Sequence, residues 1–241
     1  MDQRATLDPS YAAEPEKRYP VVYWLHRADG SQRTGAPFVA LVNKAIHGGS
    51  LKPLIVVLVN GIRRSWYCDS ADESVPAESM IVRDLIPHID SHYRTLVKRE
   101  ARAVEGFSMG AFGAAHLAFK FPELFGAVSV ISTMMPGADN FGDFPEFRQV
   151  FGGDAARAEE NCPWELSRRN ASLLRGRTTI RLVTGAGESG ADRLRRFSEH
   201  LKSLEIDSEY REVNEARHVL SRIYAALGDE HTVTFYNRLV R

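Results

Sequence analysis

Short apolar runs that alternate with amphipathic stretches constrain the fold of this chain more than any other feature of its sequence. Most of these runs are continuously apolar, which is typical of strands that are buried on both faces. The expected strands are residues 21–26, 54–60, 101–106, 127–132, 178–184 and 209–213. The stretches with helical spacing are residues 37–46, 77–93, 109–120, 191–204 and 220–227. Strands that alternate with helices predict an α/β fold with a mostly parallel sheet and helices on both of its faces.

The length and composition of the chain indicate one domain, residues 1–241. Of the 241 residues 44% are hydrophobic, which is enough for a large buried core. Basic and acidic residues each number 31, so no net charge favours binding of nucleic acid or of an anionic membrane. No apolar run has the length of a membrane span, and residues 1–20 lack the apolar segment of a signal peptide. We therefore expect a soluble, cytoplasmic protein without nucleic-acid or membrane partners.

The chain contains two cysteines, Cys68 and Cys162. Two isolated thiols do not form a disulfide framework, and no Cys/His cluster has the spacing of a zinc site. We expect both thiols to be buried and no metal to be bound.

Residues 133–177 interrupt the alternation of strands and helices. This segment is about ten times longer than a typical connection between a strand and a helix. Its large apolar residues are Met134, Met135, Phe141, Phe144, Phe147, Phe151 and Trp164. One interpretation is an insertion packed on the surface; the interpretation we favour is a lid over a binding site, because so many aromatic residues outside the sheet need a surface to cover.

The pentapeptide 106–110 places Ser108 between two glycines, directly after an expected strand and before an expected helix. This context is typical of the G-x-S-x-G nucleophile elbow. The turn is so sharp that a Cβ atom at Gly106 or Gly110 would clash, and glycine removes that atom. The serine hydroxyl would then stand above the sheet, where the N-terminus of the next helix favours negative charge.

A nucleophilic serine needs a histidine as base and a carboxylate that orients the histidine. In hydrolases with this elbow the chain order is serine, acid, histidine, with each group after a later strand. Glu188 follows the expected strand 178–184, and His218 follows the last expected strand, so both fit this order. Asp192 is the alternative acid, although it lies where the next helix should already have begun. There its charge would suit the start of the helix.

The chain resembles the esterase D-like branch of the α/β-hydrolases, which includes S-formylglutathione hydrolases, feruloyl and acetyl-xylan esterases, enterochelin esterases and mycolyltransferases. Besides the elbow, the matching stretches are RYPVVYWLH at 18–26, RSWYCDS at 64–70 and DLIPHIDSHYRT at 84–95. The resemblance covers nearly the whole chain from Arg18 onward. It implies an α/β-hydrolase fold with the catalytic residues at the carboxyl edge of the sheet and a lid-like insertion after the family's sixth strand.

Three features depart from the family pattern. Its N-terminal strands are shortened to a remnant at residues 4–7, which leaves one sheet edge bare or covered by a second subunit in a homo-oligomer. Arg27 stands where the family usually has glycine after the histidine equivalent to His26. The position of the family's usual aspartate is occupied by Glu188.

An oxyanion hole needs two backbone N–H donors. Met109, which follows the nucleophile, is expected to supply one, and the resemblance implies that Ala28 supplies the other. Arg27 is interpreted either as a solvated loop residue or as a ligand for a substrate carboxylate. Trp66 and Tyr67 are candidates for the substrate pocket.

A second motif competes with this interpretation. Residues 185–190 read GAGESG, which is also a dinucleotide-binding pattern. Its place near the C-terminus and the negative charge of Glu188 argue against nucleotide binding. The sequence therefore predicts a serine carboxylesterase that hydrolyses short-chain or aryl esters through an acyl-enzyme and needs no cofactor. The alternatives are an acyltransferase and a non-catalytic binding protein of the same fold.

Overall fold

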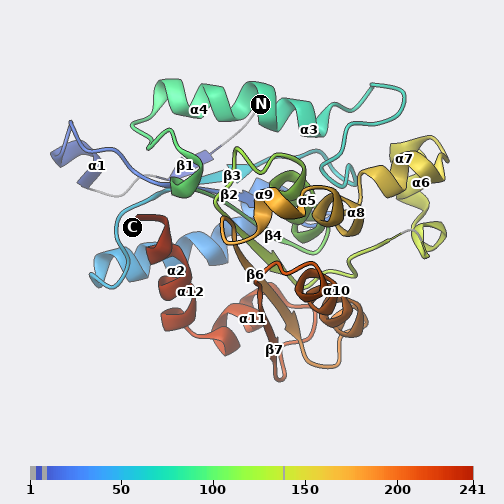
Figure 1. Cartoon of the computed structure of the whole chain (residues 1–241). Helices are drawn as coiled ribbons and strands as arrows, with labels where there is room; N and C mark the ends of the chain where they lie inside the picture. The colour runs from blue at the N-terminus through green and yellow to red at the C-terminus, as the bar shows by residue number, and fades with distance from the viewer. Residues whose placement is uncertain (1–3, 7–9, 138, 241) are drawn as a thin grey trace.

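A seven-stranded sheet forms the centre of the computed structural model of the chain, which describes residues 4–6, 10–137 and 139–240 (Figure 1). The strand order is β1-β3-β2-β4-β5-β6-β7. The six strands β2 to β7 run parallel, and β1 pairs antiparallel with β3. The strands are β1 (Arg4–Thr6), β2 (Val21–Leu25), β3 (Ile55–Val59), β4 (Arg102–Phe107), β5 (Ala127–Ile131), β6 (Thr179–Gly185) and β7 (Glu209–Val213).

Each of the six predicted strands is present, with ends within one residue of those expected. Strands β2 to β5 are buried along their whole length. The sequences of β2 and β3 are continuously apolar, whereas β4 also buries Arg102 and Glu105 and β5 buries Ser129. The short β1 confirms the N-terminal remnant over residues 4–6, whereas residue 7 lies outside the described residues. Pairing of a second subunit along this edge stays a prediction.

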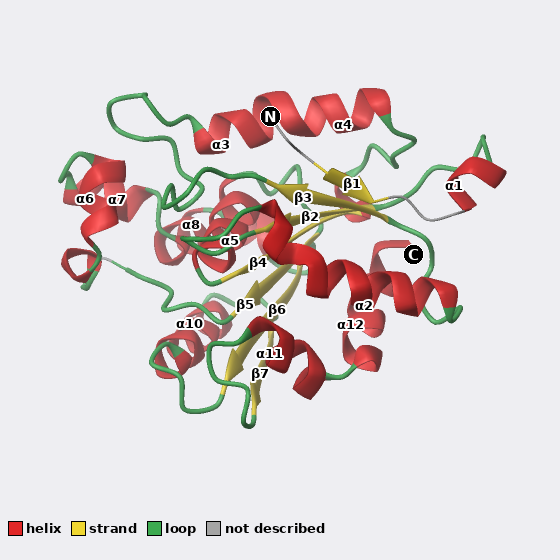
Figure 2. Cartoon of the chain, turned by 180° about the vertical axis from the view of Figure 1, so that it is seen from behind, coloured by secondary structure: helices red, strands yellow, loops and turns green. Residues whose placement is uncertain are grey.

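Two groups of helices cover the two faces of the sheet. One face carries α2 (Ala36–His47), α11 (Leu220–Leu227) and α12 (Asp229–Tyr236), which lie on the same side of the sheet in Figure 2. The other face carries α4 (Ile86–His92), α5 (Met109–Lys120), α8 (Pro163–Arg169) and α10 (Ala191–Ser203). The predicted helices are confirmed, and α12 is an additional helix. The remaining short helix near the N-terminus is α1 (Ser10–Ala13). Within the described part of the chain, no helix combines the length and the apolar character that crossing a bilayer requires.

The predicted helix 77–93 contains a π-helical turn. It consists of α3 (Ala77–Ser79), the π-helical turn Met80–Leu85 and α4. Pro87 lies at the start of α4 and has no backbone N–H for the regular bond to the preceding turn. A locally wider turn before a proline avoids the clash that a regular α-helix would create. The sequence predicted the extent of this helix but not its change of pitch.

The insertion 133–177 folds into four short helices. They are α6 (Pro145–Phe151), α7 (Ala155–Glu160), α8 and α9 (Ala171–Leu174), preceded by the 3-10 turn Phe141–Asp143. Its aromatic residues pack into the main core: the ring of Phe147 lies 4.6 Å from that of Trp66 and 5.7 Å from that of Phe112. The aromatic content therefore serves packing on α5, and the function of the insertion as a lid stays a proposal.

A buried ion pair between α3 and α5 also holds the insertion by a hydrogen bond to Asn161. His116 of α5 donates through Nε2 to Glu78 of α3 at 2.5 Å and through Nδ1 to the backbone oxygen of Asn161 at 2.7 Å. Lys120 contacts the same carboxylate at 2.7 Å. Burial opposes the charged imidazolium, but Cys68 and the Glu78 carboxylate outweigh it and raise the pKa of His116. Burial likewise opposes ionisation of Glu78, yet the bonds from His116 and Lys120 lower the pKa of its carboxyl.

Candidate active site

Ser108 occupies the tight turn between β4 and α5. Its backbone has φ 61° and ψ −120°, a conformation that few residues other than glycine adopt. A Cβ atom at Gly106 would lie 1.9 Å from the backbone oxygen of Gly110, and one at Gly110 would lie 2.2 Å from that of Leu25. The structure therefore confirms the steric reason for both glycines.

His218 faces Ser108 from the loop that follows β7. Its Nε2 atom lies 3.0 Å from the Ser108 Oγ atom. The imidazole stacks on the ring of Phe107, with the centroids 4.7 Å apart, and its side chain stays 49% exposed. Gly185 allows the loop to approach β6, because a Cβ atom there would lie 2.3 Å from the backbone oxygen of Arg217. The site is thus open to water on the side of the histidine.

Glu188 lies on the other side of the imidazole, with its Oε2 atom 3.5 Å from His218 Nδ1. The carboxylate is nearly buried, with a side-chain exposure of 4%. Ser132 donates to its Oε2 atom at 2.5 Å, and Thr184 donates to its Oε1 atom at 2.6 Å. Burial opposes ionisation of Glu188, but the nearby His218 and the hydrogen bonds from Ser132 and Thr184 outweigh this effect and lower its pKa. The group is therefore an anion at neutral pH.

Asp192 lies in the first turn of α10 and points away from this arrangement. Its side chain is 52% exposed and forms ion pairs with Arg195 and, at 2.8 Å, with Arg196. The structure places Glu188 rather than Asp192 against His218. This position agrees with the role at a helix start that the sequence offered for Asp192.

Two loops that emerge side by side carry the candidate oxyanion donors. Strands β2 and β4 are neighbours, with Leu25 paired with Gly106, so Ala28 after β2 and Met109 after β4 leave the same edge of the sheet. Met109 is the first residue of α5, where backbone N–H groups have no acceptor within the helix. His26 fixes the first loop, since its Nδ1 lies 2.7 Å from the backbone oxygen of Arg27. Burial lowers the pKa of His26.

The three candidate substrate residues lie in different environments. Arg27 is exposed at the tip of its loop. Trp66 is packed against Phe112 and Phe147, and its Nε1 atom has no hydrogen-bond partner among the described residues. Tyr67 is fully buried, and its hydroxyl donates to the backbone oxygen of His26 at 3.1 Å.

The expectation that Tyr67 lines the substrate pocket is therefore corrected. Glycines leave room for its ring beneath the loop that follows β2: a Cβ atom at Gly61 would lie 1.9 Å from the ring, and one at Gly113 would lie 2.4 Å from it. Tyr67 supports the loop that carries Ala28 and does not reach the surface.

Two hydroxyl residues of the site were missed by the sequence analysis. Ser132 directly follows β5, and Thr184 lies near the end of β6. The sequence offered one signal for both: they are polar residues at the carboxyl ends of apolar strands. That edge of the sheet is where α/β proteins place their sites.

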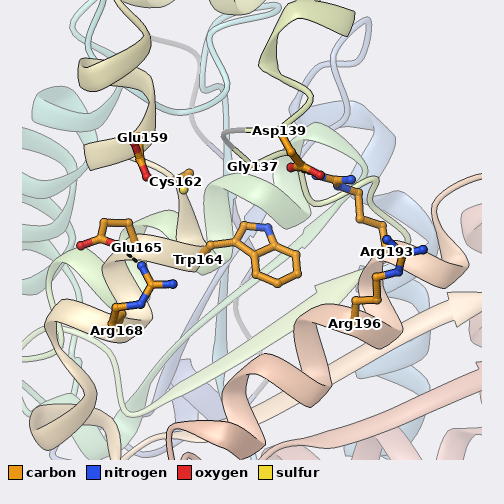
Figure 3. Close-up of a pocket in the computed structure, with 9 residues that line it drawn as sticks. All are labelled: Gly137, Asp139, Glu159, Cys162, Trp164, Glu165, Arg168, Arg193 and Arg196. Atoms are coloured by element: carbon orange, nitrogen blue, oxygen red, sulfur yellow. Dashed lines mark hydrogen bonds and ion pairs between the residues drawn. The ribbon is translucent and has the colours of Figure 1, made fainter.

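A pocket of about 320 Å³ lies to one side of these residues, between α8 and α10 (Figure 3). Trp164 lies between Arg168 of α8 and the two arginines of α10, Arg193 and Arg196. The arginines that line the pocket form ion pairs with acidic neighbours; Arg168, for example, binds Glu165. Ser108, His218 and Glu188 are not among the residues that line it.

A model of the protein family described as "Putative esterase" matches residues 3–241. The chain belongs to this family. An esterase of Mycobacterium tuberculosis (strain ATCC 25618 / H37Rv) is 33% identical over 116 residues, which are 47% of this chain and 25% of that protein. An endo-1,4-beta-xylanase/feruloyl esterase of Xylanibacter ruminicola is 30% identical over 129 residues, or 50% of this chain and 18% of that protein. The chain thus aligns with a quarter or less of the length of these curated relatives.

Solved structures of esterases share the fold over nearly the whole chain. A ferulic acid esterase has a TM-score of 0.82 at 21% identity, with 98% of this chain and 92% of that chain covered. An S-formylglutathione hydrolase from Agrobacterium tumefaciens has a TM-score of 0.81 at 20% identity, with 98% and 89% covered. These similarities confirm the expected α/β-hydrolase fold.

Proposed function

We propose that the protein is a serine carboxylesterase with Ser108 as nucleophile, His218 as general base and Glu188 as the acid of the triad. The observation that carries this proposal is the 3.0 Å contact of Ser108 Oγ with His218 Nε2 at a strained strand-to-helix turn. A serine held in this conformation and within hydrogen-bond reach of an imidazole has the arrangement of an activated nucleophile. Membership of the esterase family supports the same reaction class.

The proposed reaction proceeds in two halves. Ser108 Oγ attacks the ester carbonyl carbon while its proton passes to His218 Nε2, and the N–H groups of Met109 and Ala28 stabilise the oxyanion. The imidazolium then gives this proton to the alkoxide oxygen that leaves as alcohol, which forms the acyl-enzyme. In the second half His218 takes a proton from water as the water oxygen attacks the acyl carbon, and the imidazolium then returns this proton to Ser108 Oγ as the carboxylic acid leaves.

Exposed apolar residues at the sheet edge that carries Ser108 favour an ester with a small apolar or aryl acyl group. Ile62, Met134 and Val219 follow β3, β5 and β7 at the same edge of the sheet, and each remains exposed. Single exposed apolar side chains around a site suit a short acyl chain or an aromatic ring. The feruloyl esterase named among the relatives and the ferulic acid esterase among the solved structures are consistent with an aryl ester. Arg27, exposed beside Ala28, would bind a carboxylate in the alcohol part of the substrate.

The test combines turnover with covalent labelling. Wild-type protein should hydrolyse p-nitrophenyl acetate and react with a fluorophosphonate probe at Ser108. Ser108→Ala should lose labelling and lower turnover by up to about a million-fold. Ser203→Ala, which removes an exposed hydroxyl at the end of α10, serves as control and should behave like the wild type. A Ser108→Ala variant with a tenth of wild-type turnover would refute the mechanism.

The same assay separates the two alternative functions. A non-catalytic binding protein would react with the fluorophosphonate no faster than the Ser108→Ala variant. An acyltransferase would form a new ester when an alcohol is added, in place of free carboxylic acid. We favour hydrolysis because half of the His218 side chain is exposed to water, which can therefore reach the acyl-enzyme.

A further inference from the structure

Ser132 contacts both the proposed base and the proposed acid. It is fully buried directly after β5, and its backbone N–H donates to the backbone oxygen of Val183 at 2.7 Å. Its Oγ atom lies 2.8 Å from His218 Nδ1 and 2.5 Å from Glu188 Oε2. The Ser132 hydroxyl therefore contacts both His218 and Glu188, and a triad depends on how these two groups are oriented toward each other.

The distances show that the hydroxyl provides the shorter connection. Hydrogen bonds from N–H to oxygen have donor–acceptor distances of about 2.7–3.2 Å. The direct contact of His218 Nδ1 with Glu188 Oε2 is 3.5 Å, outside this range. The contact of Nδ1 with Ser132 Oγ lies inside it.

One assignment of protons satisfies all three groups. The ionised Glu188 only accepts hydrogen bonds, so Ser132 must donate its hydroxyl proton to the carboxylate. The Ser132 oxygen then keeps its lone pairs free to accept the Nδ1 proton of His218. This assignment leaves Nε2 unprotonated toward Ser108, as a general base requires.

We propose that Ser132 is a positioning residue that connects Glu188 to His218, so that the machinery is a chain of four residues: Ser108, His218, Ser132 and Glu188. The inference rests on the proposed function, because it assigns Ser132 a part in the same reaction. Ser132 does not touch substrate and acts through the tautomer and the orientation of the imidazole.

The backbone of Ser132 is a second, independent observation. Its φ of 55° lies in the left-handed region, which non-glycine residues rarely adopt. Such conformations concentrate at functional sites, where the surrounding structure holds them in place. Here the bond to Val183 holds the residue, and the hydroxyl reaches the loops that follow β6 and β7.

The experiment removes the hydroxyl without adding backbone strain. Ser132→Gly is the main variant because glycine tolerates this φ, and Ser132→Ala is a second one. Thr133→Ala is the matched control, since it deletes a neighbouring buried hydroxyl that bonds only the Met135 backbone N–H among the contacts seen. For each variant, kcat and KM for p-nitrophenyl acetate are measured, and active sites are counted by fluorophosphonate titration.

The two Ser132 variants should lower kcat about 100-fold, the lower end of what a positioned general base contributes, with little change in KM. Thr133→Ala should keep the wild-type kcat. The double variant Ser132→Gly/Glu188→Gln should be no slower than Glu188→Gln alone, because both residues act through His218. The inference would be overturned if Ser132→Gly kept more than half of the wild-type kcat. It would also be overturned if the loss of kcat in the double variant equalled the product of the losses in Ser132→Gly and Glu188→Gln.

A measurement without turnover separates this inference from the proposed function. The proton NMR signal of His218 Nδ1–H, assigned by its loss in His218→Gln, should shift in Ser132→Gly and stay in place in Thr133→Ala. An unchanged signal in Ser132→Gly refutes the role of Ser132 even if the protein is an esterase. If Ser108→Ala keeps its activity while the signal shifts, the proposed reaction fails but the hydrogen-bond chain is upheld.

Discussion

Exchange of the carboxylate for an amide should lower turnover strongly at Glu188, whereas at Asp192 it should lower only the folding stability. Glu188 is nearly buried, accepts bonds from Ser132 and Thr184, and faces His218, whereas Asp192 is half exposed and faces two arginines. Glu188→Gln removes the negative charge that stabilises the imidazolium. It also replaces one carboxylate oxygen, which only accepts hydrogen bonds, with an amide N–H group that donates them. Loss of the correct tautomer lowers the turnover of a serine protease by about 10⁴-fold.

This factor corresponds to about 5.5 kcal/mol of activation free energy, since each tenfold change in rate is worth about 1.36 kcal/mol. For Asp192→Asn the relevant interaction is an exposed ion pair at a helix start, worth about 0.2–1 kcal/mol of folding stability and no rate. The side chain of Asp192 is 52% exposed, which keeps this value low. The two variants should therefore differ by about four orders of magnitude in kcat.

The assay is kcat for p-nitrophenyl acetate at neutral pH, together with the melting temperature of each variant. Active sites are titrated with fluorophosphonate so that any unfolded fraction is corrected. Asp192→Asn should keep the wild-type kcat with a melting temperature lowered by a few degrees at most. Full activity of Glu188→Gln together with collapse of Asp192→Asn would refute the assignment of the acid.

Three further predictions address the elbow, the buried ion pair and the substrate. Gly106→Ala should abolish activity and folding at the elbow, because its Cβ atom would lie 1.9 Å from the backbone oxygen of Gly110, and soluble expression with wild-type kcat would contradict this. The pKa of His116 is raised in the folded protein and that of Glu78 is lowered. The pair therefore contributes fully to the free energy of unfolding between about pH 4.5, the ordinary pKa of Glu78, and about pH 6.5, the ordinary pKa of His116. The free energy of unfolding should fall as the pH rises from 6.5 through the pKa of folded His116, and His116→Gln should lose this slope in urea titrations. Acetyl to butyryl p-nitrophenyl esters should be hydrolysed faster than palmitoyl esters, and the reverse order would indicate a long acyl channel.

Local sequence patterns were sufficient for the sheet and for the elbow. A strand that is buried on both faces is mostly apolar along its length, so β2 to β6 could be located within a residue from the apolar runs of the sequence. The collision of Gly106 with Gly110 is a property of five consecutive residues and needs no knowledge of distant parts of the chain. The family resemblance added Ala28 as the second candidate donor of the oxyanion hole.

Features that depend on distant contacts were not predictable. The aromatic residues of the insertion suggested a surface over a site, which stays a proposal, but not that Phe147 would pack on Trp66 and on Phe112 of α5. Tyr67 stands beside Trp66 in the sequence, yet glycines in two other segments bury it. Neither outcome can be derived from the residue types, since each depends on which elements meet in space.

The glutamate at the acid position and the serine at residue 132 are best understood together. The sequence suggested that glycines would let the loop of Glu188 retreat to absorb its additional methylene. In the structure this loop is packed closely against the segment after β5. A Cβ atom at Gly190 would lie 2.8 Å from the backbone oxygen of Thr133, so the loop has no room to move closer to that segment. The carboxylate comes to rest 3.5 Å from Nδ1, and the hydroxyl of Ser132 contacts both groups. Glu188→Asp alone should therefore be slower than wild type, because the shorter side chain recedes from Ser132. Measuring kcat of Glu188→Asp checks this, and a variant as fast as the wild type would show that the additional methylene has no part in the geometry.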